Sequence, residues 1–338
     1  MVPAGGPLLL TQGDPAGIGP ELALSAWLRR AEGVPPFAVL ANPAHLSRLA
    51  RDLGWDVPIV ACEAAAAAQA FGEALPVIPL AAGGSAMPGR PDPRTAPSTL
   101  ESIERAVASV RRGEAAALVT NPIAKHVLYE AGFEHPGHTE FLAALAATPE
   151  EPAPHPVMML WSETLMVVPV TVHIPLRDVP RALTRSLIVG TARIVVRDLV
   201  ERFGIESPRV AVAGLNPHAG ENGALGREDG AVIAPAVAAL RAEGFRVEGP
   251  VPADTMFHPR ARGRFDVALA MYHDQALIPI KTIAFDEAVN VTLGLPFVRT
   301  SPDHGTAFDI AGRGITRPDS LIAALKLAAR LARRAPAR

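Results

Sequence analysis

Two residue types that often carry chemistry, cysteine and lysine, are scarce in this 338-residue sequence. Cys62 is the only cysteine, which excludes an intrachain disulfide and a cysteine-based zinc site, so a reducing compartment is the simplest expectation. Of the 32 basic residues only Lys125, Lys281 and Lys326 are lysines. Because the sequence otherwise uses arginine, each lysine is a candidate for a role that a guanidinium cannot fill. The alternative is that the three lysines have no special role. Lys326 fits the solvated face of a C-terminal helix.

The sequence also lacks a long apolar run and an excess of charge of one sign. Polar residues and a proline interrupt the alanine-rich segment 61–82, so no stretch reaches the roughly 18 apolar residues of a transmembrane helix. The N-terminus shows no basic segment followed by an apolar core, as a secretion signal requires. The net charge is −2, and no run of Lys and Arg is interleaved with aromatics. We therefore expect a cytoplasmic protein whose partner is a small molecule rather than nucleic acid or a membrane.

The sequence has ample apolar material, with 49% hydrophobic and 20% charged residues and a mean hydropathy of +0.21. The length suggests about two domains. Short runs that are apolar on both faces predict buried, parallel-type strands at 7–11, 37–41, 74–80, 114–120, 166–172, 209–214, 266–272 and 290–295. Apolar residues at helical spacing, each segment ending in glycine, predict helices at 21–33, 97–113, 186–204 and 227–244. The fold class is thus α/β with largely parallel sheets, with loops at 83–97 and 150–156.

Polar residues follow several predicted strands at the edge where α/β sheets bind ligands. Three of these residues are histidines on three separate strands: His173, His218 and His273. One such histidine is more often a loop residue than a ligand, but three at one edge form a plausible site for Zn²⁺ or another divalent ion. Asp274 could be a further ligand, a residue that orients a ligand, or a base. The other strand ends carry Gln12-Gly13-Asp14 and Asn121-Pro122.

Four further segments have both a functional and a purely structural interpretation. GDPAGIGPE (13–21) is a glycine-rich strand-to-helix turn that does not match G-x-G-x-x-G. HPGHTEFLA places His138 and Thr139 before a helix, where Thr139 could be only an N-cap. NPHAGENGALGRE is a glycine-rich loop that could bind an anion or simply turn. Lys281, Asn290 and Arg299 could bind a phosphate or carboxylate together.

Eight strings of residues between positions 13 and 312 resemble, in the same order, the 4-hydroxythreonine-4-phosphate dehydrogenase family of vitamin B6 biosynthesis. The segment Asp303–Gly314, which begins in the last string and ends two residues beyond it, is also similar to the cofactor loop H-G-S-A-P-D-I-A-G of the isocitrate and isopropylmalate dehydrogenases. The segment MMLWSETLMVVPVTVHIPL departs from the family's usual Ala-Gly-containing run. The strings are GDPAGIGPE, TNPIAKHVL, HPGHTEFLA, HIPLRDV, LNPHAGENGALGRE, GPVPADTMF, AMYHDQALIPIK and VNVTLGLPFVRTSPDHGTAFDIAG.

The resemblance implies two α/β/α domains of the isocitrate/isopropylmalate dehydrogenase type with the active site in a cleft. It implies a discontinuous N-terminal domain, 1–130 plus 300–338, on the cofactor side, and a second domain, 131–299, on the metal, substrate and dimerisation side. It also implies a homodimer whose partner completes the site. The site residues it implies are His173, His218 and His273 for the metal; His138, Thr139, Lys281, Asn290 and Arg299 for the substrate; and His304, Gly305, Thr306 and Asp309 for the dinucleotide.

The implied reaction is oxidation of 4-phosphooxy-L-threonine by NAD or NADP, with loss of CO₂ to give 3-amino-2-oxopropyl phosphate. A divalent ion, Zn²⁺, Mg²⁺ or Co²⁺, would assist. Asp274, Lys281 and His138 are all candidates for the catalytic base. One alternative is a relative that oxidises threonate or erythronate 4-phosphate or an aromatic dihydrodiol dicarboxylate. Alternatives of other classes are a three-histidine metallohydrolase, which would need no NAD(P), and a noncatalytic metabolite-binding protein.

Overall fold

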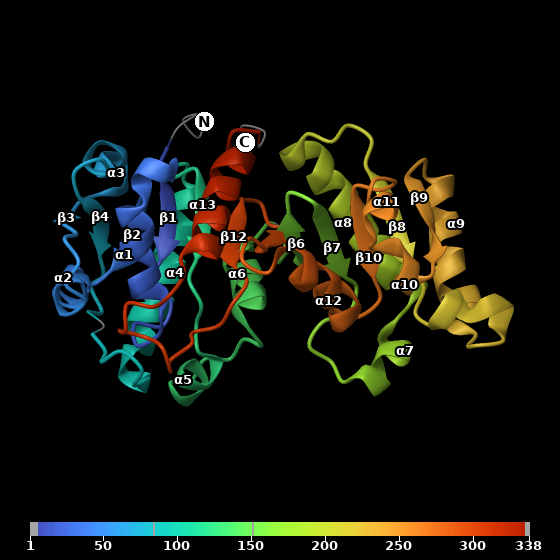
Figure 1. Ribbon diagram of the computed structural model, residues 1–338, viewed down its shortest axis with the longest axis horizontal. Coiled ribbons are helices and arrows are strands. Elements are labelled where there is room, and N and C mark those ends of the chain that lie inside the picture. The colour runs from blue at the N-terminus through green and yellow to red at the C-terminus, as the bar shows by residue number, and fades with distance from the viewer. Residues whose placement is uncertain (1–5, 84, 151, 335–338) are drawn as a thin grey trace. The chain divides into compact units, whose positions relative to one another are not determined.

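The computed structural model describes residues 6–83, 85–150 and 152–334, and it divides into two compact units (Figure 1). The first unit is Met1–Pro156 together with Leu295–Arg338, and the second is Val157–Gly294. The first unit consists of two separate stretches of the chain, and these stretches end and begin at other residues than the expected 130 and 300. Segments 131–156 and 295–299 belong to it, and with them His138, Thr139 and Arg299.

The apolar core of the first unit explains these boundaries. Phe141 and Leu142 pack in one buried cluster with Ile103 and Val107, and Leu295 and Phe297 join the same cluster. Burying these side chains stabilises the segments within the first unit at roughly 25 cal/mol per Å² of apolar area.

The first unit contains an all-parallel run of strands in the order β3-β4-β2-β1-β5-β12. Most of these strands were predicted from their apolar runs, while β3 and β12 were not. β12 is hidden from such a search because its sequence is Arg-Thr-Ser-Pro, although all four residues are buried. The bounds are β1 Leu8–Thr11, β2 Phe37–Ala41, β3 Ile59–Ala61, β4 Leu75–Pro79, β5 Ala117–Thr120 and β12 Arg299–Pro302.

The helices of the first unit follow from apolar spacing and from local capping. In α2, His45, Leu46, Leu49 and Ala50 are buried on one side, and the Asn42 side chain caps the helix by accepting from the backbone of Ala44. The bounds are α1 Gly19–Leu28, α2 Pro43–Asp52, α3 Ala64–Ala70, α4 Ala96–Arg111, α5 Lys125–Glu130, α6 His138–Ala146 and α13 Asp319–Ala332, with 3-10 turns at Arg30–Glu32 and Pro93–Thr95.

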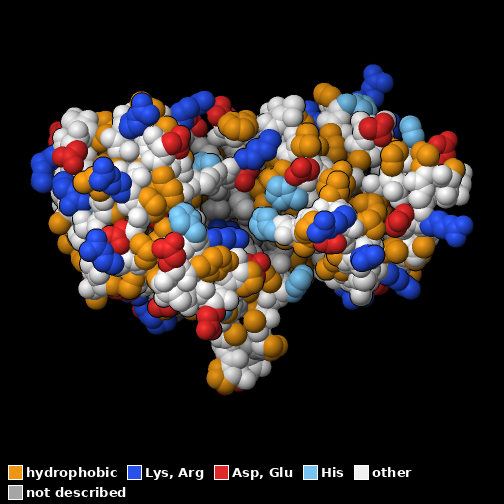
Figure 2. All heavy atoms as spheres, turned by 90° about the horizontal axis from the view of Figure 1, so that it is seen from below, with side chains coloured by type: hydrophobic (Ala, Val, Ile, Leu, Met, Phe, Trp, Pro, Cys, Tyr) orange, Lys and Arg blue, Asp and Glu red, His pale blue; other side chains and the backbone are white. Residues whose placement is uncertain are grey.

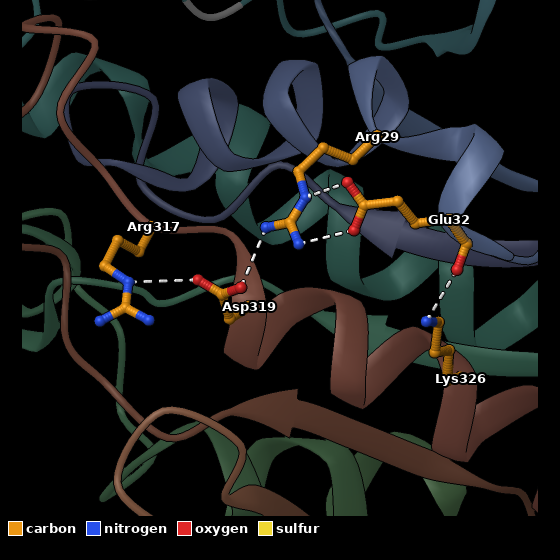
Figure 3. Close-up of polar contacts among 5 residues, drawn as sticks. All are labelled: Arg29, Glu32, Arg317, Asp319 and Lys326. Atoms are coloured by element: carbon orange, nitrogen blue, oxygen red, sulfur yellow. Dashed lines mark hydrogen bonds and ion pairs between the residues drawn. The ribbon is translucent and has the colours of Figure 1, made fainter.

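The last helix of the described chain, α13, packs on β12 and against α1 (Figure 1). Polar contacts fasten its start to the end of α1 (Figure 3). Arg29 bridges Glu32 at 2.7 Å and Asp319 at 3.0 Å, and Lys326 donates to the Glu32 carbonyl at 3.0 Å. Lys326 is thus exposed, as expected, but it also ties α13 to the end of α1.

The second unit contains a mixed sheet in the order β11-β6-β7-β10-β8-β9. β7, β10, β8 and β9 are parallel, but β6 is antiparallel to both β7 and β11. The expectation that β11 pairs as a parallel strand is therefore wrong for its contact with β6. Glu163-Thr164 is a two-residue turn that makes β6 and β7 a hairpin, and a hairpin is antiparallel. The bounds are β6 Val157–Ser162, β7 Leu165–Pro169, β8 Arg209–Ala213, β9 Arg246–Val251, β10 Val267–Ala270 and β11 Val289–Leu293.

The helices of the second unit confirm two predicted glycine ends. The long helix α8 continues into a π-helical turn and ends at Gly204, and α9 is followed by Gly244; both glycines are left-handed. The bounds are α7 Val179–Ala182, α8 Arg185–Asp198, α9 Ala234–Ala242, α10 Ala253–Met256, α11 Pro259–Arg262 and α12 His273–Ala284, with short turns at Leu176–Asp178, Leu199–Phe203, Pro217–Gly223 and Asp229–Ile233. In the described residues, none of the helices has the length and apolarity to cross a membrane.

Candidate active site

Two of the three predicted strand-end histidines meet in the second unit. β7, β10 and β8 are adjacent and parallel, so their carboxyl ends share one edge of the sheet. His173 follows β7 and His273 begins α12 directly after β10, and their ring centroids are 5.7 Å apart. Thr171 Oγ1 donates to the Met271 carbonyl at 2.7 Å and holds the two strand ends together. The structure thus brings these two predicted ligands together at one edge of the sheet.

The histidine pair lines a pocket of about 250 Å³ in the second unit. His273 Nδ1 is 2.7 Å from Asp274 Oδ1, a contact that leaves Nε2 as the ring nitrogen able to bind another group. Of the three roles expected for Asp274, this contact favours orienting His273. The pocket is lined by Thr171, Val172, His173, Ile174, Leu176, Val179, Tyr272, His273 and Asp274.

The third histidine, His218, lies on an unusual left-handed turn after β8. Consecutive residues from His218 to Asn222 all have positive φ, with φ 52° at His218. His173 is also left-handed, at φ 47°. Non-glycine residues pay roughly 1–2 kcal/mol each for this conformation, and such strain concentrates at functional sites. Backbone strain therefore marks two of the three predicted ligands independently of their residue type.

The described residues of this one chain do not bring all three histidines together: they contain no group of three or more His, Cys, Asp or Glu side chains able to hold a metal ion. The predicted substrate residues of this unit also stand apart from the pair. Lys281 lies at the other end of α12 from His273, about 12 Å along the helix axis. Asn290 lies on β11, three strand spacings across the sheet from β10, the strand that precedes His273. Its register partner on β10 is Ala268, so the two residues are about 14 Å apart.

The remaining predicted substrate residues lie together in the first unit. Arg299 begins β12, is 4% exposed, and donates to Thr120 Oγ1 through Nη2 at 2.6 Å and Nε at 3.1 Å. Burial lowers the pKa of Arg299 to about 10. Burial, and then the positive charge of Arg299, lowers the pKa of His138 well below its ordinary value. His138 Nε2 is buried and has no hydrogen-bond partner among the described residues.

Thr139 is not the N-cap of α6. The helix begins at His138, Gly137 is the capping residue, and no side chain caps it. The purely structural interpretation of Thr139 is therefore wrong, because the chain turns two residues earlier than that interpretation requires. His138 and Thr139 both lie in the first turn of the helix, where exposed N–H groups favour anions.

The predicted cofactor loop packs on the glycine-rich turn after β1. Ile18 N donates to the Thr306 carbonyl at 3.0 Å, and a Cβ on Gly17 would lie 3.0 Å from the same oxygen. The buried Glu21 accepts from Gly312 N at 2.8 Å and from Thr316 Oγ1 at 2.7 Å. The turn 13–21 and the loop 303–316 are therefore packed and hydrogen-bonded to each other. At Gly305 the loop leaves open space, because a Cβ there would meet no atom within 4 Å.

Three residues near these sites escaped the sequence argument. Glu21 closes the string 13–21, and the sequence predicts no role of its own for it. Gln275 joins the ends of two strands, since it accepts from Met271 N at 2.6 Å and donates to the Gly214 carbonyl at 2.7 Å. Asp229 accepts from the backbone just before the left-handed turn. Their long-range partners give no signal in a single sequence.

The fold and the site define an α/β protein with a strained, histidine-bearing edge in one unit and a buried cationic site in the other. The chain belongs to the family described as pyridoxal phosphate biosynthetic protein PdxA, whose model matches residues 34–328. It is 63% identical to 4-hydroxythreonine-4-phosphate dehydrogenase from Methylorubrum populi, over 97% of this chain and 95% of the relative.

Solved structures agree with this assignment. A crystal structure of 4-hydroxythreonine-4-phosphate dehydrogenase from Klebsiella pneumoniae superposes with a TM-score of 0.84 at 38% identity, covering 97% of this chain and 99% of that one. A terephthalate 1,2-cis-dihydrodiol dehydrogenase from Burkholderia xenovorans gives a TM-score of 0.64 at 28% identity, covering 96% and 98%.

Proposed function

We propose that this protein oxidises the secondary alcohol of 4-phosphooxy-L-threonine with NAD or NADP and that the product loses CO₂ to give 3-amino-2-oxopropyl phosphate. The single observation that carries the proposal is the identity of 63% over 97% of the chain to a relative named for this dehydrogenase. The reaction belongs to the formation of pyridoxine 5′-phosphate, and the single cysteine is compatible with the cytoplasm.

His173, His218 and His273 would hold one divalent ion. The neighbouring rings of His173 and His273 and the contact from Asp274 to Nδ1 of His273 fit this use, because a ligating histidine commonly has its second nitrogen fixed by a carboxylate. When bound, such an ion lowers the pKa of a coordinated hydroxyl and polarises a carbonyl. Neutral imidazoles suit Zn²⁺ or Co²⁺, and open positions would leave room for substrate.

The substrate's anionic groups would be bound by the side chains that the family resemblance implies. Arg299 offers a buried guanidinium held by Thr120, and His138 offers a buried Nε2 beside it. Thr139, Lys281 and Asn290 complete the proposed set. Because its pKa is lowered, His138 is neutral at pH 7, so Nε2 can exchange a hydrogen bond with a substrate hydroxyl. Asp274 is engaged by His273, which leaves His138 and Lys281 as the better candidates for moving the proton.

The dinucleotide would bind over His304, Gly305, Thr306 and Asp309. The open space at Gly305 and the anchoring of the loop by Glu21 support this placement, because an ordered backbone can approach a ligand closely where no side chain stands.

A second copy of the chain would complete the metal site. The support is twofold: His218 is not grouped with the other two histidines, and the second unit exposes Ile278 (63%), Phe285 (70%) and Leu176 (66%). Large apolar side chains with this exposure favour burial in an interface. On the face shown in Figure 2, acidic and basic side chains are interspersed, which favours neither nucleic acid nor an anionic membrane as partner.

The test is a substrate comparison with the purified protein and NAD or NADP, following formation of the reduced nucleotide. We expect turnover with 4-phosphooxy-L-threonine and little with a phosphate-free terephthalate dihydrodiol. The reverse preference would transfer the assignment to the dihydrodiol class of the Burkholderia xenovorans neighbour. Metal-dependent hydrolysis without any nucleotide would overturn the dehydrogenase assignment altogether.

A further inference from the structure

The left-handed turn that carries His218 needs an explanation, because its conformation opposes the preference of its own residues. His218, Ala219, Glu221 and Asn222 all have φ between 41° and 54°. L-residues avoid this region unless surrounding contacts hold them there. The contacts that hold the turn should therefore converge on one group nearby.

That group is the carboxylate of Asp229, which is 2% exposed. Oδ1 accepts from Leu215 N at 2.8 Å, and Oδ2 accepts from Asn216 N at 3.2 Å and from Asn216 Nδ2 at 2.9 Å. These donors form the stem from which the turn begins at Pro217. Hydrogen bonds from several N–H groups to one buried carboxylate fix the positions of those groups strongly.

Three glycines allow this approach. A Cβ on Gly214 would lie 2.8 Å from Asp229 Oδ1, and one on Gly220 would lie 3.1 Å from Oδ2. A Cβ on Gly226 would overlap the side chain of Asn216. The loop thus closes around Asp229 and Asn216 only because side chains are absent at these positions.

We propose that Asp229 is a positioning residue for His218: its carboxylate stabilises the left-handed turn and so fixes the direction in which the imidazole is presented to the metal ion. This inference rests on the proposed role of His218 as a ligand. Asp229 itself touches neither substrate nor metal in this assignment, and it acts through the backbone of Leu215 and Asn216.

The test compares Asp229→Asn with Asp198→Asn in the full-length protein after metal removal. In Asp229→Asn an amide N–H₂ replaces one acceptor oxygen and meets a backbone donor. Asp198 is a matched control, because it is a fully buried carboxylate of the same unit that accepts from Gly294 N at 2.8 Å without touching the His218 turn. Two readouts are taken: the affinity for Co²⁺ alone, by competition with a chelator, and hydrogen exchange at the amides of Leu215 and Asn216.

We expect Asp229→Asn to bind Co²⁺ about 10-fold or more weakly and to exchange both amides faster, whereas Asp198→Asn binds Co²⁺ like the wild type even if its thermal midpoint falls as far. Equal Co²⁺ affinity in Asp229→Asn and wild type, or equal weakening in both variants, would overturn the inference. A wild type that binds no Co²⁺ would also overturn the inference. Nucleotide reduction is measured separately, because it tests the proposed reaction and not the role of Asp229.

If Asp229→Asn does not fold, the same measurement is made on two glycine variants, one that disturbs the loop and one that does not. Gly226→Ala pushes on Asn216, whereas Gly230→Ala meets no atom within 4 Å. Only Gly226→Ala should weaken Co²⁺ binding. The same affinity in both variants would contradict the proposal that the contacts of Asp229 and Asn216 position His218.

Discussion

Glu21 shows how one buried carboxylate can control a loop that lies far away in the sequence. One oxygen accepts from Gly312 N, within the predicted cofactor loop, and the other accepts from Thr316, two residues beyond the end of that loop. In Glu21→Gln, the amide nitrogen would face one of these donors and leave it unsatisfied. A buried unsatisfied donor costs about 1–3 kcal/mol, and 1.4 kcal/mol is tenfold in affinity.

We therefore expect Glu21→Gln to bind NAD or NADP about 10-fold more weakly while its affinity for the phosphorylated substrate changes less than about 2-fold. Calorimetric titration with each ligand measures both. Glu32→Gln, in the 3-10 turn that follows the same helix but exposed, is the control and should change neither affinity. Parallel losses for substrate and nucleotide would show that Glu21 supports the fold generally and not the cofactor loop.

The buried side chain of His45 makes the free energy of unfolding depend on pH. Burial is the main cause that lowers its pKa to about 4, and the charge of Arg48 adds to it. The unfolded chain takes up a proton near pH 6.5 and the folded chain does not, so the contribution of His45 is complete above pH 6.5 and is lost as the pH falls toward 4. The full change is at most about 3 kcal/mol.

Urea unfolding at a series of pH values checks this expectation. The wild type should lose stability between pH 6.5 and 4 more steeply than His45→Gln, which has no titrating ring in that window. Identical slopes for the two proteins would mean that His45 is accessible to protons in the folded state.

At the scale of the secondary-structure elements, the sequence predicted what depends on local pattern. The apolar runs of β1, β2, β5 and β10 and the glycine that follows α9 appear as expected, because burial and glycine conformations act over a few residues. β12 escaped prediction because its Arg299 and Thr300 are buried through polar contacts with distant elements. The left-handed turn at His218 escaped for the same reason, since Asp229 holds it from outside the turn.

The junction between α1 and α13 provides a prediction at this scale. Figure 3 shows the ion pair between Arg29 and Asp319. The two side chains are 3.0 Å apart and are 35% and 30% exposed. A partly exposed ion pair contributes about 0.5–1 kcal/mol. A double-mutant cycle with Arg29→Gln and Asp319→Asn should give a coupling energy of that size. A coupling of zero would mean that apolar packing alone fastens α13 to α1.

At the scale of the whole molecule, the exposed apolar side chain of Ile278 on α12 predicts self-association. We expect Ile278→Glu to sediment as a monomer under conditions where the wild type is a dimer, because the substitution buries a charge in the proposed interface. Val200→Glu, at a residue that is 41% exposed in the same unit, is the control and should remain dimeric. A wild type that is monomeric at all concentrations would remove the second copy from the proposed site.

The candidate site could be predicted from the sequence only in part, because some of its residues are positioned by contacts between distant segments of the molecule. The proximity of His173 and His273 was expected from the rule that parallel strands end at one edge, and their rings lie 5.7 Å apart in the structure. No rule of local pattern indicates that His218 stands apart, because its position depends on the strained turn that carries it.

The metal dependence of nucleotide reduction with 4-phosphooxy-L-threonine tests the proposed dehydrogenase reaction and its metal site together. We expect chelation to abolish the reaction, added Zn²⁺ or Co²⁺ to restore it, and His218→Ala to lose both bound metal and turnover. Undiminished turnover by a metal-free protein, or by a His218→Ala variant without metal, would contradict this proposal.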